Sequence, residues 1–177
     1  MPRTTVEKQL ERSKSEGWIY RGDMATEGEV LELIHAIIRI TKPEICVETG
    51  TYHAHGTQAI ANGLQMNGKG KVWTVEAHDD YEYSPHDFVE FIQADSVEWT
   101  ANEAPKNIDF AFVDCGPPDV RIKAFTNLLP KMAPDGIIMV HDTAFYESKF
   151  LEQLSMAYGC PPNFNFPALN GVVGWQS

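Results

Sequence analysis

Residues 45–57 read ICVETGTYHAHGT, in which a short apolar run passes through a glycine into a stretch with helical spacing. The apolar run predicts a strand, and Gly50 permits a tight turn where a ligand can approach the backbone. The helix after the turn presents free N–H groups at its N-terminus. Tyr52 stands at the second glycine position of a G-x-G-x-x-G turn, which argues against NAD. The stretch therefore predicts a ligand-binding strand–turn–helix.

Apolar runs and helical stretches alternate on both sides of this turn, which predicts an α/β fold with a parallel sheet covered on both faces. A pair of strand-like pieces around Asn170-Gly171 predicts a closing hairpin, and the stretch between Glu76 and Phe88 predicts a loop. The length suits a single domain over 1–177, with a helix and loop extension at 1–25. Strands are predicted at 45–47, 72–75, 91–92, 108–113 and 137–140, and helices at 28–41, 56–66, 96–104, 120–132 and 144–157.

The composition narrows the classes of partner and compartment. The net charge is −11, from 25 acidic and 14 basic residues, and such a chain is repelled by nucleic acid and by anionic membranes. Its three cysteines contain no Cys-x-x-Cys, so neither a disulfide framework nor a thiolate zinc site is indicated. A charged N-terminus and the lack of any long apolar stretch predict a cytoplasmic protein.

Acidic and hydroxyl side chains follow the second and third predicted strands. Glu76 ends the second strand, where a carboxylate either accepts the hydroxyls of a bound ribose or stays solvated. Asp95 and Ser96 follow the third strand, where they contact an adenine amino group or cap the next helix, and the two roles are compatible. Together with the glycine turn, these residues predict a nucleoside site.

A second polar group lies at the ends of the two remaining strands. Asp114 ends 108–113, and His141 and Asp142 end 137–140. Clustered carboxylates are usually paired, protonated or bound to a cation. Oxygen ligands suit Mg²⁺ or Mn²⁺, and an imidazole tolerates Mn²⁺ better. The alternative is that Asp142 caps the following helix and His141 makes a local hydrogen bond.

These motifs resemble the class I S-adenosylmethionine-dependent methyltransferases, in particular the small O-methyltransferases, over about residues 26–145. That family commonly opens a helix near a Glu-Gly pair, as in Glu27-Gly28, and carries Glu-x-Gly-Thr-Tyr-x-Gly before its first helix. This chain has ETGTYHA at 48–54, with Ala54 where the family prefers glycine, and Gly56 is expected to compensate in part. The resemblance implies that the cofactor is bound by Glu48, Gly50, Thr51, Tyr52, Glu76, Asp95 and Ser96.

The resemblance also implies a fold and a reaction. The fold is a Rossmann-like, seven-stranded, mostly parallel sheet with helices on both faces and a C-terminal antiparallel hairpin. The reaction is methyl transfer to a hydroxyl of a small molecule, with Asp114 and His141 catalytic. A metal ion, Mg²⁺ or Mn²⁺, is expected on Asp114, His141 and Asp142; without a metal, His141 is the general base. The His-Asp pair differs from the family's Asp-Asn pair and is similar to related sugar and natural-product methyltransferases.

Alternatives to this interpretation come from other classes of protein. Residues 114–119 (DCGPPD) lack the Asn/Asp-Pro-Pro-aromatic motif of the amino-methyltransferases that act on nucleic acid. A non-catalytic S-adenosylmethionine-binding domain and a nucleotide-sugar or NAD-binding enzyme on a similar sheet stay open. By analogy with the family, a homodimer can complete the substrate pocket.

Overall fold

The computed structural model describes residues 26–79, 83–143, 148–166 and 171–176. They form a seven-stranded sheet in the order β3-β2-β1-β4-β5-β7-β6. The first five strands of this order are parallel, and β7 runs antiparallel to both β5 and β6. The strands are β1 Ile45–Thr49, β2 Lys71–Glu76, β3 Val89–Gln93, β4 Ile108–Val113, β5 Met132–His141, β6 Phe164–Phe166 and β7 Val172–Gln176.

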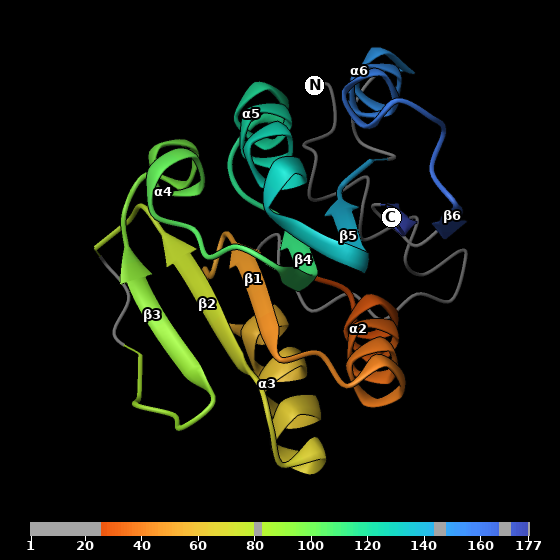
Figure 1. Ribbon diagram of the computed structural model, residues 1–177. Coiled ribbons are helices and arrows are strands. Elements are labelled where there is room, and N and C mark those ends of the chain that lie inside the picture. The colour runs from red at the N-terminus through yellow and green to blue at the C-terminus, as the bar shows by residue number, and fades with distance from the viewer. Residues whose placement is uncertain (1–25, 80–82, 144–147, 167–170, 177) are drawn as a thin grey trace, which may run out of the picture.

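Helices cover both faces of the sheet (Figure 1). One layer contains α2 Gly28–Thr41 and α3 His55–Asn67, and the other contains α4 Ser96–Asn102, α5 Pro118–Leu128 and α6 Ser148–Tyr158. Successive side chains of β4 face the two helix layers alternately. Phe110 and Phe112 pack under α2 and α3, whereas Ala111 and Val113 face the opposite core. Burial on both faces explains why this strand is apolar at almost every position.

The helix α2 shows how the local sequence sets an element. Val30, Ile34 and Ile38 recur at helical spacing and are fully buried against the sheet. The helix ends at Thr41, where Lys42 adopts a left-handed conformation and donates its N–H to the carbonyl oxygen of Ile38. Pro43 follows and does not continue a helix. The predicted helix at 28–41 is therefore confirmed to the residue.

The largest differences from the predicted elements lie around β5. The helix predicted to reach residue 132 ends at Leu128, because Pro130 has no N–H with which to continue the i to i−4 hydrogen bonds of the helix. A 3₁₀ turn at Leu129–Lys131 follows. β5 then begins at Met132, five residues before the predicted strand, because its first half contains proline, aspartate and glycine and so hides the strand pattern.

The C-terminal strands confirm the predicted antiparallel pair, although residues 167–170 between them lie outside the described part of the chain. The predicted N-terminal extension at 1–25 and the start of the helix predicted at 144–157 also lie outside it. Within the described residues, no helix combines the length and the apolar character that crossing a membrane requires. The carboxyl ends of β1, β2, β4 and β5 meet at one edge of the sheet, where ligands bind in folds of this kind.

Candidate active site

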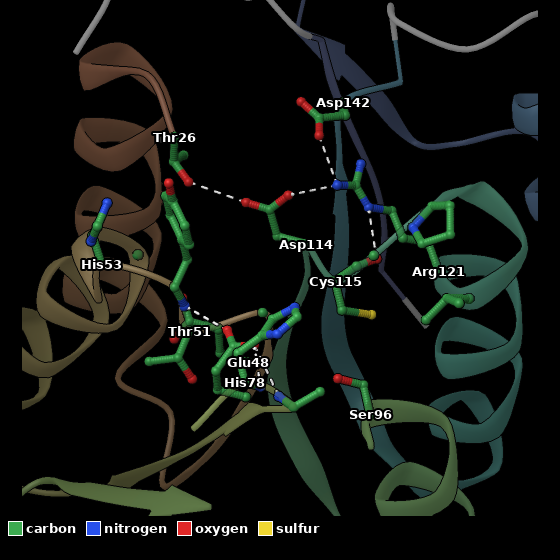
Figure 2. A pocket seen from close by; sticks show the side chains of 18 of the residues that line it. Thr26, Glu48, Thr51, His53, His78, Ser96, Asp114, Cys115, Arg121 and Asp142 are labelled. Carbon is green, nitrogen blue, oxygen red and sulfur yellow. Dashed lines mark hydrogen bonds and ion pairs between the residues drawn. The ribbon is translucent and has the colours of Figure 1, made fainter. Parts of the chain in front are cut away.

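A cavity of about 560 Å³ lies at these strand ends, within the size range of small-molecule sites. Asp114 and Asp142 line this cavity, but His141 does not. Figure 2 shows side chains from β1, α4 and α5 and from the residues directly after β4 converging on it. All seven residues predicted for the cofactor line the cavity: Glu48, Gly50, Thr51, Tyr52, Glu76, Asp95 and Ser96.

The loop from Gly50 to Ala54 has an unusual backbone. Gly50, Tyr52 and Ala54 have φ angles of +88°, +44° and +60°, a region that side-chain-bearing residues rarely adopt. Ala54 is left-handed, a conformation that glycine adopts without steric cost, which fits the glycine expected at this position from the resemblance. Gly56 does not compensate, since it lies inside α3, where an added Cβ would collide with the Glu48 carboxylate. Strained backbone of this kind is concentrated at ligand sites.

Glu76 is fixed in place before any ligand binds. Its Oε2 accepts a hydrogen bond from the Tyr52 N–H at 2.8 Å, and its Oε1 accepts from the N–H groups of Ala77 and His78 at 2.9 and 3.1 Å. A carboxylate offers about four lone-pair positions, so the three N–H groups leave acceptor capacity toward the cavity. This arrangement favours the ribose-binding role over a solvated strand end.

Asp95 fills one of the two roles considered for it. Its Oδ1 accepts hydrogen bonds from the N–H groups of Val97 and Glu98, both at 2.9 Å, so it caps α4. Asp95 and the buried Ser96 also line the cavity. The capping role is present in the structure, and the adenine contact stays a prediction.

Glu48 lies beneath the cavity, fully buried. Its Oε2 accepts hydrogen bonds from the hydroxyls of Thr57 and Thr74. Burial raises the pKa of Glu48 to about 8, because hydrogen bonds to the two hydroxyls do not compensate for the lost hydration of the charge. At neutral pH the protonated form of Glu48 is therefore favoured.

Glu48→Gln is expected to flatten the dependence of stability on pH. Between its ordinary pKa of 4.5 and its folded pKa of about 8, the folded protein holds a proton that the unfolded chain has released. Each rise of one pH unit in that window therefore lowers the free energy of unfolding by about 1.4 kcal/mol at most. Glutamine cannot ionise, so the variant gains stability relative to the wild type as the pH rises from 5 to 8.

Urea unfolding of both proteins at pH 5, 6.5 and 8 measures this difference. Glu44→Gln is the matched control, because Glu44 precedes the same strand and its side chain is 70% exposed. Parallel stability curves for the wild type and Glu48→Gln would show that Glu48 is ionised in the folded protein.

His141 is held between two carboxylates behind the cavity wall. Its Nε2 lies 2.6 Å from Oε2 of Glu27, and its Nδ1 lies 3.1 Å from Oδ1 of Asp114. Burial opposes the charged form, but Asp114 and Asp142 outweigh it and hold the pKa of His141 well above its ordinary value. Both ring nitrogens therefore donate, and His141 is an imidazolium.

Arg121 of α5 lies between the same aspartates (Figure 2). Its Nη2 is 2.7 Å from Oδ2 of Asp142 and 3.2 Å from Oδ1 of Asp114. Its Nε and Nη1 donate to the carbonyl oxygens of Cys115 and His141. Asp142 is thus paired with an arginine, and the next described helix, α6, begins only at Ser148.

Asp114 connects this charged group to the cavity. Its Oδ2 accepts a hydrogen bond from Thr26 at 3.2 Å, while Oδ1 faces His141 and Arg121. Burial alone would raise the pKa of Asp114, but the charges of His141 and Arg121 and the hydrogen bond from His141 outweigh it and hold the pKa below its ordinary value. Asp114 is therefore an ionised carboxylate at the wall of the cavity.

The structure brings the three predicted metal-ligating residues together, with one possible ligand atom of each within 4.8 Å of the others. A metal there stays a prediction. Arg121 was not predicted from the sequence, and Glu27 was named only as part of a Glu-Gly pair. The only sequence signal for Arg121 was its place in the helix directly after the strand that carries Asp114.

Comparison with known proteins is consistent with this geometry. No curated protein matches the chain. Among solved structures, the O-methyltransferase TomG of Streptomyces achromogenes, involved in tomaymycin synthesis and crystallised with S-adenosylmethionine, has a TM-score of 0.70 at 14% identity, over 100% of this chain and 91% of that chain. A 1,6-didemethyltoxoflavin-N1-methyltransferase of Burkholderia thailandensis, with its substrate and S-adenosylhomocysteine bound, has a TM-score of 0.64 at 16% identity, over 100% and 92%.

These structures show the fold, and the family follows from the sequence. A family model described as a methyltransferase domain matches residues 47–143, more than half of the chain. The match begins in β1 and ends just after Asp142, so it spans the glycine turn, Glu76 and Asp114. The predicted fold and the resemblance to class I methyltransferases are confirmed, and the chain belongs to this methyltransferase-domain family.

Proposed function

We propose that this protein transfers the methyl group of S-adenosylmethionine to a hydroxyl of a small molecule. The observation that carries the proposal is that Glu76 and the ionised Asp114 line the same cavity. Glu76 is oriented to accept hydroxyl hydrogens of a nucleoside, and Asp114 is oriented to accept the proton of an acceptor. Two similar enzymes, TomG and the toxoflavin methyltransferase, bind S-adenosyl compounds at this fold.

The residues of the cavity suit this cofactor. Glu76 would hold the ribose, Asp95 and Ser96 the adenine, and the turn at 50–52 would pass close to the amino-acid part. Bound there, S-adenosylmethionine supplies a methyl group whose bond to sulfur breaks, with its electron pair going to the sulfur, as the bond to the acceptor oxygen forms. The protein has to align that oxygen and remove its proton.

Asp114 is the group that would take the proton. It lines the cavity, is ionised and has one oxygen directed toward Thr26 rather than into the ion pairs. His141 would act through Asp114, since both of its nitrogens contact carboxylates and it does not reach the cavity. Asp114 is thus the proposed catalytic base, and His141, Glu27 and Arg121 are positioning residues that hold it charged and oriented.

Calorimetric titration with S-adenosylmethionine and S-adenosylhomocysteine, with NAD as the control ligand, tests the cofactor. We expect saturable binding of the two sulfur compounds and none of NAD. Binding of NAD alone would replace the proposal with a nucleotide-dependent enzyme. Binding of the sulfur compounds without turnover of any hydroxyl acceptor would indicate a non-catalytic cofactor-binding domain.

Glu76→Ala is expected to weaken S-adenosylmethionine binding about 10- to 100-fold, the worth of hydrogen bonds to a charged acceptor. Glu76→Gln keeps one acceptor oxygen and should lose less. Glu90→Ala on the neighbouring strand is the control, because Glu90 pairs with Lys71 at the surface. Melting temperatures verify folding. An unchanged dissociation constant in a folded Glu76→Ala variant would remove Glu76 from the ribose site.

The remaining expectations are part of the proposal and rest on composition or analogy. They are a cytoplasmic location, a single domain, a possible homodimer and no nucleic-acid or membrane partner. The strongly negative net charge supports the last of these.

A further inference from the structure

We propose that Arg121 takes the place of a divalent cation between Asp114 and Asp142, so that the active site works without a metal ion. The catalytic meaning of this inference rests on the proposed function, but the occupancy of the site by a guanidinium can be tested separately. In Figure 2 the Arg121 side chain extends from α5 to the point where the two carboxylates converge.

Distances carry the first step. The possible ligand atoms of Asp114, His141 and Asp142 lie within 4.8 Å of one another, which is the spacing of a candidate metal centre. Mg²⁺ binds carboxylate oxygens at about 2.0–2.1 Å and cannot share them closely with a second cation. Nη2 of Arg121 already lies 2.7 Å from one aspartate and 3.2 Å from the other. An ion that bound these same two oxygens would have to displace the guanidinium.

The second step is that Arg121 is held where it is. Its side chain is only 5% exposed, and two backbone carbonyl oxygens, of Cys115 and His141, accept its Nε and Nη1 hydrogens at 3.1 and 3.0 Å. His141 is the last residue of β5, and Cys115 follows the end of β4 by two residues, so both carbonyls lie at the edge of the sheet. If this anchored guanidinium moved aside, it would leave the carboxylates of Asp114 and Asp142 without their counter-ion, which is costly for buried groups.

The third step concerns the nitrogen ligand. A histidine binds a metal through a lone pair on a neutral ring. Nε2 of His141 contacts Glu27, and Nδ1 lies 3.1 Å from Asp114 and 3.5 Å from Asp142. Both ring nitrogens are therefore engaged by carboxylate oxygens, while the guanidinium of Arg121 lies between Asp114 and Asp142.

The test begins with protein from which any bound metal has been removed by dialysis against a chelator. Mn²⁺ is then titrated in, and electron paramagnetic resonance measures the free ion. We expect the wild type to bind no Mn²⁺ stoichiometrically. Arg121→Gln removes the positive charge that lies between the partly buried Asp114 and the buried Asp142, and it should create one Mn²⁺ site, at least about tenfold tighter than any in the wild type. Adding Asp114→Asn to that variant should abolish the site. Lys123→Gln, an exposed charge on the same helix, should behave as the wild type.

A stoichiometric Mn²⁺ site in the wild type that Asp114→Asn removes would overturn the inference, as would a folded Arg121→Gln variant that binds no Mn²⁺. If Arg121→Gln does not fold, the melting temperature of the wild type decides: we expect no change with Mn²⁺, and a rise would refute the inference. S-adenosylmethionine plays no part in these measurements. Cofactor binding together with a wild-type Mn²⁺ site would therefore refute only the inference, and absence of both would refute only the proposed function.

Discussion

Asp114→Ala is expected to lower kcat for methyl transfer about 10²- to 10⁴-fold, the usual contribution of a positioned general base. Asp114 is the ionised carboxylate that lines the cavity beside Thr26, so its loss leaves the acceptor proton without a recipient. Affinity for S-adenosylmethionine should change much less, because the proposed ribose contact is on β2. Transfer of labelled methyl groups to a panel of hydroxyl acceptors measures the effect.

The alanine variant also removes a counter-ion of His141 and Arg121. An effect on folding therefore has to be distinguished from an effect on the methyl-transfer step. Asp114→Asn preserves the shape of the side chain and cannot accept the proton as a carboxylate does. A loss in both variants with normal melting and cofactor affinity supports the catalytic role. Asp119→Ala is the control, since Asp119 is an exposed carboxylate on α5. Wild-type turnover in a folded Asp114→Ala variant would contradict the proposed mechanism.

Gly50→Ala is expected to lower the free energy of unfolding by about 2–5 kcal/mol, the sum of a left-handed backbone penalty and overpacking. Gly50 has φ +88°, and an added Cβ would lie 2.7 Å from the carbonyl carbon of Asp114 and 3.0 Å from Cα of Cys115. Both obstacles are backbone atoms that cannot rotate away. The ends of β1 and β4 must separate, so cofactor affinity should fall as well.

Gly68→Ala is a matched control that isolates the collision. Gly68 has φ +69°, but a Cβ added there would meet no atom within 4 Å, so only the backbone penalty of about 1–2 kcal/mol remains. Urea unfolding of the two variants gives the difference. Equal losses of stability would show that the close approach of β1 to β4 does not constrain Gly50.

The elements that were predicted well are those set by nearby residues. The spacing of Val30, Ile34 and Ile38 marks α2, and the apolar run at 108–113 marks β4. The glycine turn and Glu76 were also predicted from the sequence. Both follow strand ends, and the carboxyl ends of parallel strands lie at the same edge of the sheet. The start of β5 was missed, because its polar first half is paired with β4 across a register shift that no local pattern encodes.

The sequence by itself determined the α/β fold, the glycine turn and the acidic residues at the strand ends that line the cavity, because hydrophobic periodicity and strand ends are local properties. Only the tertiary structure decided what surrounds Asp114. Glu27 and His141 are separated by 114 positions, and Arg121 reaches Asp142 across 21. Such ion pairs depend on which strands are neighbours and on how deeply each charge is buried. Burial also raises the pKa of Glu48, the surrounding carboxylates raise the pKa of His141, and a guanidinium lies where a metal ion was predicted.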